Sequence, residues 1–384
     1  MDYRHTENLT DSFQECRKQK DNPHNVLLCV AVAGLMLLLT LAVGCSQKTK
    51  LGLIGNQKVD RINAFNSSAI TLEGDVSIPR GANSEHYAMA ISTLGNRGYV
   101  SGVYSSTIHV VSLKNMPPTV SKTFNATHSA SLLATPPGQQ ALMFVAAGRD
   151  GRQGVVSTIN AVNGNEIDRI KLGQDTHPQA ITVCDNDETI LVAVDVPHEV
   201  RKFTIANDGS LLNPGKSYPY KHGTRAADVV CAPDSKTGVV VMGHGGASGG
   251  SGNFTYAESF DLKTMTGNHT QRLAGQIGYS AVLSQNGKTL YIHSGDSNFL
   301  GRGYIEAFTF RPKTGQFGSV TNGSAPVMGQ QFLRDPSTLA IDGSRLFVTD
   351  RLNDRVLVLD SGSLSMLQTL SGNFKRPLEI SITP

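Results

Sequence analysis

LFVTDRLNDRVLVLD, residues 346–360, consists of two β-rich runs joined by a short polar break. Val, Leu, Phe and Thr in partly alternating patterns favour strands over helices, so the stretch predicts two paired strands. The same form recurs in RGYVSGVYSSTIHVVSL, ALMFVAAGRDGRQGVVSTI, ILVAVDVPHEVRKFTI and TLYIHSGDSNFLGRGYIEAFTF, and GVVVMGHGGASGGSGNFTYAESFDL repeats it around a longer break. The chain is therefore a series of repeats of one unit.

Another β-rich strand precedes each pair, and a fourth strand follows most pairs after turns such as ANDGSL and PKTGQF. Four short strands, repeated at intervals of about 40 to 60 residues, indicate the blade of a β-propeller. The leading strands start at residues 86, 128, 177, 225, 278, 335 and 376.

The last leading strand, RPLEISITP, has no partner strands after it, whereas residues 58–79 contain strands without a leading one. Pairing the two ends would complete a seventh blade and remove two exposed sheet edges. We therefore expect an all-β, seven-bladed β-propeller over residues 58–384. A β-sandwich array, which needs no pairing of the ends, is the alternative. We expect three segments before the propeller: a polar leader (1–25), an apolar segment (26–45) and a linker (46–57).

The H-P start of one leading strand, the FVTD and RVLVLD runs and the NDG turn resemble the YVTN/lactonase-like propeller family. The resemblance covers most of residues 80–384 and rests on blade-forming residues. It implies an exported propeller related to enzymes that open or close lactones of sugar acids and muconates.

Composition argues against a nucleic-acid partner. The chain is 39% apolar and 17% charged, its net charge is only +3, and no basic run exceeds RKQK. Phosphate backbones are bound by concentrated basic faces, which this sequence lacks.

Residues 26–45, VLLCVAVAGLMLLLTLAVGC, carry no charge and would span about 30 Å as a helix, enough to cross a bilayer. The AVGC ending after a basic region resembles a bacterial lipoprotein signal, with Cys45 as the lipidated residue. A helix over residues 26–44 that stays uncleaved is the alternative, giving a type II protein with a luminal or extracellular propeller. Either route exports the globular part, to the periplasm and outer membrane or the cell surface.

The cysteines exclude several kinds of site. No C-x-x-C is present, which excludes zinc ribbons, redox dithiols and covalent haem attachment by pattern. Cys184 and Cys231 close similar segments, TVC and VVC, in neighbouring repeats. We expect two buried free thiols there, although an exported protein could form a disulfide.

Candidate site residues follow from the repeat, because the start of each inner strand and the break between the second and third strands share one face. Imidazoles there could act as general base or bind a divalent metal, and arginines could hold a carboxylate. No cofactor is required by the pattern, but a divalent metal is permitted. The catalytic candidates are His86, His128, His177 and Arg225, and the three histidines are also the metal candidates.

The remaining loop residues on that face are expected to bind a ligand. Asp228 and Glu379, three residues inside their strands, are expected to point toward the channel. The ligand-binding candidates are Arg149, Arg152, His198, His244, Asp296, Arg302, Asp335 and Arg376.

Two functions fit these residues. The first is a membrane-anchored, exported binding module that engages a small anionic ligand or a protein through its channel mouth. The second is a lactonase-like hydrolase of a small anionic sugar lactone, in which water attacks with a histidine as base. A purely structural use of the H-P and R-P starts, as strand starts and loop caps, is the third interpretation.

Overall fold

The computed structural model describes residues 50–57, 60–78, 89–102, 105–136, 143–185, 187–212, 215–222, 225–244, 254–295, 303–320 and 336–383. Within these ranges the secondary structure is β-strand, apart from one 3-10 turn at Arg351–Asn353. The apolar segment with Cys45 lies outside the described residues. No helix among the residues that are described has the length and hydropathy needed to span a bilayer.

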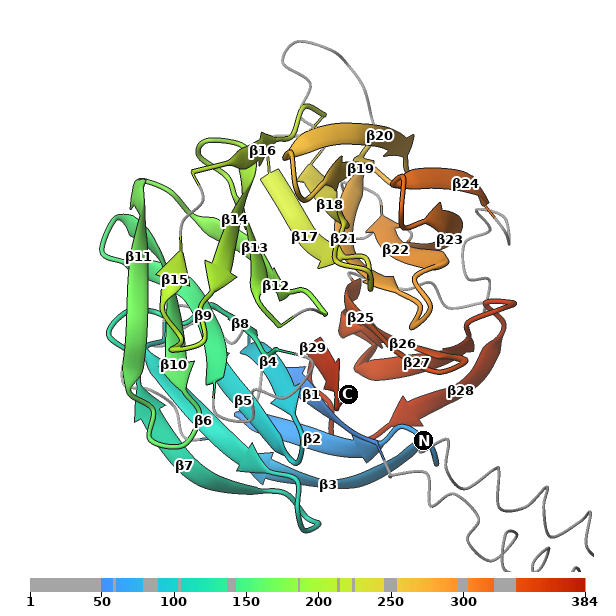
Figure 1. Ribbon diagram of the computed structural model, residues 1–384. Coiled ribbons are helices and arrows are strands. Elements are labelled where there is room, and N and C mark those ends of the chain that lie inside the picture. The colour runs from blue at the N-terminus through green and yellow to red at the C-terminus, as the bar shows by residue number, and fades with distance from the viewer. Residues whose placement is uncertain are drawn as a thin grey trace, which may run out of the picture. The chain divides into compact units, whose positions relative to one another are not determined.

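The strands form seven antiparallel sheets arranged as the blades of a propeller (Figure 1). Blade 1 contains β29 (Pro377–Ile382), β1 (Leu51–Asn56), β2 (Arg61–Asn66) and β3 (Thr71–Ser77), from the channel outward. Blade 2 contains β4 (Met89–Leu94), β5 (Arg97–Gly102), β6 (Thr107–Ser112) and β7 (Thr119–Asn125). Blade 3 contains β8 (Leu132–Ala134), β9 (Met143–Asp150), β10 (Gln153–Asn160) and β11 (Glu166–Gln174).

Blade 4 differs from the others because two short strands share its outer edge. It contains β12 (Pro178–Val183), β13 (Thr189–Val194), β14 (Glu199–Ile205), β15 (Leu211–Leu212) and β16 (Ser217–Pro219). Blade 5 contains β17 (Arg225–Cys231), β18 (Thr237–His244), β19 (Tyr256–Asp261) and β20 (Thr266–Arg272). Blade 6 contains β21 (Ile277–Leu283), β22 (Thr289–Gly295), β23 (Gly303–Arg311) and β24 (Gln316–Val320). Blade 7 contains β25 (Pro336–Asp342), β26 (Arg345–Asp350), β27 (Arg355–Asp360) and β28 (Met366–Ser371).

The predicted pairing of the two ends of the propeller is confirmed. β29 pairs antiparallel with β1, with Gly52 opposite Ile382 and Ile54 opposite Ile380 (Figure 1). Two bonds between Leu51 and Thr383 extend this pairing: the Leu51 amide donates to Thr383 Oγ1 at 3.1 Å, and the Thr383 amide donates to the Leu51 carbonyl at 2.8 Å. The propeller also starts earlier than predicted, because β1 lies in the stretch expected as a linker. Its short, Gly-containing sequence LGLIGN offers a weak strand pattern.

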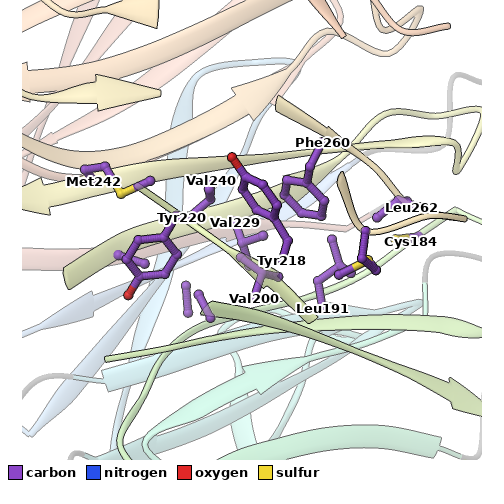
Figure 2. Close-up of a cluster of buried hydrophobic side chains, with 14 residues drawn as sticks. Cys184, Leu191, Val200, Tyr218, Tyr220, Val229, Val240, Met242, Phe260 and Leu262 are labelled. Atoms are coloured by element: carbon purple, nitrogen blue, oxygen red, sulfur yellow. The ribbon is translucent and has the colours of Figure 1, made fainter. Parts of the chain in front are cut away.

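Apolar clusters between neighbouring blades form the core. Strand alternation places one apolar set against the preceding blade and the other against the following blade. Figure 2 shows the cluster between blades 4 and 5, where the Tyr218 ring stacks on Phe260 with centroids 4.6 Å apart. A fully buried side chain of this size stabilises the fold by about 1.5–3 kcal/mol. The Tyr218 and Tyr220 hydroxyls point to opposite sides of this cluster.

A disulfide joins blades 4 and 5, so the expectation of two free thiols was wrong. Cys184 directly follows β12 and Cys231 ends β17, and their Cα atoms are 5.3 Å apart. The inner strands of adjacent blades run side by side, so equivalent repeat positions come close together. That closeness, rather than the sequence separation of 47, decides the pairing.

A repeated polar contact joins three pairs of adjacent inner strands. The side chain lies in or directly after a bulge near the start of each strand, and it accepts an amide hydrogen from the inner strand of the next blade. We call these contacts the channel belt. They connect Asp228 Oδ2 to the Ala281 amide (2.8 Å), Ser280 Oγ to the Leu339 amide (2.9 Å) and Thr338 Oγ1 to the Ile380 amide (3.1 Å).

Candidate ligand site at the channel mouth

Five polar side chains form a continuous row across blades 3, 4 and 5, which we call the mouth network. Its ends are two arginines, one near the end of a second strand and one at the start of an inner strand. Between them lie residues at one end of the β12–β13 pair, where β12 begins and β13 ends. The mouth network consists of Arg149, His177, Asp195, Gln179 and Arg225.

Asp195 and Gln179 connect the two halves of the row. The His177 amide donates to Asp195 Oδ1 at 3.0 Å, and Gln179 Nε2 donates to Asp195 Oδ2 at 3.3 Å. Gln179 Oε1 in turn accepts from Arg225 Nε at 2.5 Å. The amide side chain of Gln179 therefore fixes the Arg225 guanidinium relative to the neighbouring blade.

The contact with Arg149 determines which ring nitrogen of His177 carries the proton. A guanidinium only donates hydrogen bonds, so the His177 Nε2 that contacts Arg149 must be the accepting nitrogen. The proton then lies on Nδ1, whose distance to Asp195 Oδ2 is 3.6 Å. Arg149 Nε is buried and has no hydrogen-bond partner within the described residues, so this guanidinium keeps an unused donor.

The structure adds a pair that sequence reasoning missed. Glu258 in β19 is buried, and His222 in the segment before β17 donates to its Oε1 from Nδ1 at 2.7 Å. Tyr218 directs its hydroxyl hydrogen to the same carboxylate. The only sequence signal was an acid inside an otherwise apolar run, YAESFD, and the segment of His222 matched no repeat position.

Of the predicted catalytic candidates, His177 and Arg225 come together in the mouth network, as does the predicted ligand residue Arg149. His128 lies elsewhere: the inner strand β8 starts only at Leu132, which leaves His128 in the connection before it. It is buried, with Nε2 2.7 Å from Ser157 Oγ and Nδ1 2.8 Å from the Ser129 carbonyl. Burial lowers the pKa of this imidazole, and its contacts hold the connection in place.

The other predicted ligand residues are more scattered. His198 is exposed, with its ring 5.9 Å from the Tyr220 ring, and Arg152 is exposed at the β9–β10 turn. The Arg376 amide donates to Asp354 Oδ1 at 2.6 Å. The backbone of His244 ends β18 opposite Arg225. Four candidates lie outside the described residues: His86, Asp296, Arg302 and Asp335.

The described residues contain no group of three His, Cys, Asp or Glu side chains that could hold a metal ion. Because His86 is not among them, the proposed three-histidine set stays a prediction.

Asp228 and Glu379 are the two acids predicted to point into the channel. Desolvation raises the pKa of Glu379 to about 8, and the nearby Asp228 charge adds to the rise. Desolvation also raises the pKa of Asp228 to about 7, against the stabilising hydrogen bonds from the Ala281 and Val229 amides. Asp228 thus has a structural use in the channel belt, and its charge contributes to the raised pKa of Glu379 although their blades are not adjacent.

No sequence profile of a known family matches the chain, and no curated protein matches it in sequence. Solved structures do match. A protein of unknown function from Desulfotomaculum acetoxidans DSM 771 gives a TM-score of 0.68 at 15% identity, over 87% of this chain and 99% of that one. A "putative 6-phosphogluconolactonase" from Bacteroides fragilis gives 0.66 at 14% identity, over 89% and 99%. A protein of the same description from Bacteroides uniformis gives 0.64 at 14%, over 88% and 100%. At these identities the likeness shows a common fold.

Proposed function

We propose that the protein hydrolyses a small lactone that carries an anionic group, bound at the channel mouth. One observation carries the proposal: the mouth network holds two guanidinium groups, of Arg149 and Arg225, on either side of an imidazole–carboxylate pair. The names of two structural neighbours describe lactonases of a phosphorylated sugar acid, which agrees with this substrate class.

The two arginines would recognise the anionic group. Charge-assisted hydrogen bonds from a guanidinium to a carboxylate or phosphate are short and specific in direction. Arg149 contributes a buried Nε donor that has no partner in the described structure, and Arg225 is exposed with only its Nε engaged by Gln179. Opening the lactone develops negative charge on the carbonyl oxygen, which a guanidinium can also stabilise.

A second candidate is a binding module without chemistry. It is favoured by the contact between Arg149 and His177 Nε2, because that nitrogen cannot take a proton while it accepts from a guanidinium. In this case the same arginines would hold a sugar acid or a similar anion.

We further propose that the propeller is exported and attached to a membrane, through Cys45 or through residues 26–44. The disulfide between Cys184 and Cys231 supports an oxidising compartment. Fatty-acid labelling of the wild type, with no labelling and no cleavage in Cys45→Ala, is the result expected for a lipoprotein. Normal processing of that variant would contradict the lipoprotein, whereas a wild type that is neither labelled nor cleaved is the result expected for the uncleaved anchor.

The function is tested with the full-length protein in mild detergent, by acid release at constant pH. The substrates are 6-phosphogluconolactone and its uncharged counterpart gluconolactone, and binding of the corresponding acids is measured by calorimetry. We expect the wild type to hydrolyse the phosphorylated lactone. In Arg225→Gln the KM for this substrate should rise about 10-fold or more, because the variant loses a charge-assisted hydrogen bond to the anionic group. The uncharged lactone should show no such change.

Arg152→Gln is the matched control, because Arg152 is an exposed arginine at the β9–β10 turn, outside the mouth network. Tight acid binding without turnover of either lactone would favour the binding module. If neither binding nor turnover occurs, both candidate functions are wrong.

A further inference from the structure

We infer that His222, held by Glu258, is the catalytic base of ester hydrolysis at the channel mouth. The inference rests on the proposed function, because a lactone is an internal ester. It assigns the catalytic base, which the mouth network leaves unassigned. His177 has its accepting nitrogen occupied by Arg149, whereas His222 uses Nδ1 for Glu258.

The Glu258 carboxylate has more donors around it than a structural role would require. Its side chain is 1% exposed, and four donors converge on it: the Tyr218 hydroxyl, the amides of Lys221 and His222, and His222 Nδ1. The two amides lie 3.1 and 2.8 Å from Oε1. These donors fix the position of the carboxylate, and its Oε1 beside Nδ1 favours the His222 tautomer with hydrogen on Nδ1.

The next blade provides an internal comparison. Glu306 occupies the same position in β23 as Glu258 in β19, since Val240 pairs with Glu258 and Ile292 pairs with Glu306. Glu306 also fixes the connection to its own blade, by accepting from the Ala274 amide at 3.0 Å, and it accepts from Ser294 Oγ at 3.1 Å. It makes no contact with a histidine within the described residues. Glu306 therefore holds its connection without a histidine, and the histidine in blade 5 is an addition to this repeated feature.

The interrupted outer edge of blade 4 makes this addition possible. Its outer edge is divided between β15 and β16, and Tyr218 in β16 turns its ring into the cluster between blades 4 and 5. From there its hydroxyl reaches Glu258. The chain then continues through Tyr220 to His222, so the interruption and the Glu258 contacts belong to one segment.

The contacts on either side of His222 place it beside the mouth network. The Tyr220 hydroxyl donates to the Val194 carbonyl at 2.6 Å, directly before Asp195, and Arg225 is bonded to Gln179. His222 lies two residues after Tyr220 and three before Arg225, so its Cα is within about 11 Å of both. Its side chain is 43% exposed, which gives solvent and substrate access to the imidazole.

The proposed step is general-base hydrolysis. His222 Nε2 takes a proton from water as the water oxygen bonds to the ester carbonyl carbon. The tetrahedral intermediate then breaks its bond to the ring oxygen, which receives the proton from His222. The products are a free carboxylic acid and a hydroxyl on the same molecule, and the charge of Glu258 stabilises the imidazolium between the two proton transfers.

The experiment separates the base from lactone recognition by using two substrates on the full-length protein. 4-Nitrophenyl acetate tests the base without requiring recognition of an anion, and 6-phosphogluconolactone tests the proposed function. We expect His222→Gln to lower kcat for the acetate about 100-fold, the usual contribution of a general base, with KM within threefold of wild type. The pH–rate profile should lose its acidic limb.

Two variants serve as controls. His269→Gln removes an exposed histidine in β20 and should leave the acetate rate unchanged. Glu258→Gln should reduce kcat, while Glu306→Gln removes the equivalent structural carboxylate in blade 6 and should not.

The outcomes for the two proposals differ. If wild type hydrolyses the acetate no faster than His222→Gln, or the variant keeps the acidic limb, the inference about His222 is wrong whatever the lactones show. If the acetate activity depends on His222 but neither lactone is hydrolysed, the base is supported and the lactone function is wrong.

Discussion

The Glu379 carboxyl in the channel lowers the stability of the folded protein by an amount that depends on pH. The pKa of Glu379 is raised to about 8, so folding favours its protonated form. Below pH about 4.5 the folded and unfolded chains are both protonated and the cost is absent. Between about pH 4.5 and 8 the unfolded chain loses the proton first, so stability falls as pH rises and levels off above pH 8.

Glu379→Gln removes this titration. We expect the variant to match wild type at pH 4 and to exceed it by several kcal/mol, at most about 5, at pH 9, measured by urea unfolding. Glu188→Gln, at an exposed glutamate, is the control and should parallel wild type. Equal pH slopes in Glu379→Gln and wild type would show that the channel does not desolvate this carboxyl.

The hydrogen bond between His128 and Ser157 is buried, and we expect it to stabilise the fold. Ser157→Ala leaves His128 Nε2 buried beside a methyl group, at a cost of about 1–3 kcal/mol, the usual penalty for an unpartnered buried group. Thermal unfolding measures it, with the exposed Ser363→Ala as control. A loss below 0.5 kcal/mol, smaller than a typical hydrogen bond, would argue against the His128–Ser157 bond.

The positions of individual side chains show which parts of the candidate site could be predicted from the sequence. The repeat predicted that Arg149, His177 and Arg225 share one face, because a strand start and the turn between the second and third strands lie on the same side of a blade, and the structure joins the three in the mouth network. It could not place His222 and Glu258, since their contact depends on the path of an irregular connection. His128 was assigned to the mouth because the pattern set the start of its strand four residues before that of β8.

At the level of elements, the strands were predictable from alternation and turn residues, and the exceptions have weak patterns. β1, LGLIGN, contains two glycines in six residues, and the outer edge of blade 4 divides into strands of two and three residues. Such strands are defined by pairing with a neighbour rather than by their own pattern. The divided edge is nonetheless the element that delivers Tyr218 to Glu258.

The disulfide links two elements, β12 and β17. The double variant Cys184→Ser/Cys231→Ser should lose about 2–4 kcal/mol of stability, the typical effect of a bridge closing a loop of this size. Urea unfolding of wild type with and without reductant provides the comparison, and the reduced wild type should match the double variant. No change on reduction would mean that the bridge does not constrain the unfolded chain.

For the whole molecule, closure of the ring depends on β29. Deleting residues 377–384 removes the inner strand of blade 1 and exposes the edges of β1 and its apolar neighbours Ile54 and Phe65. We expect loss of soluble protein or a fall in Tm of more than 10 °C, because the change removes several buried side chains at about 1.5–3 kcal/mol each. Removing only Pro384 is the control. An unchanged melting transition would contradict closure by β29.

The order in which the strands are synthesised gives this closure a further consequence. β1 is made early and β29 last among the described strands, and Leu51 and Thr383, which bond to each other, are 332 residues apart. Blade 1 therefore lacks one of its four strands until every other blade has been synthesised. During that time the edge of β1 is unpaired and accessible to chaperones and proteases. A chain that stops before β29 keeps this edge unpaired, whereas β29 covers it.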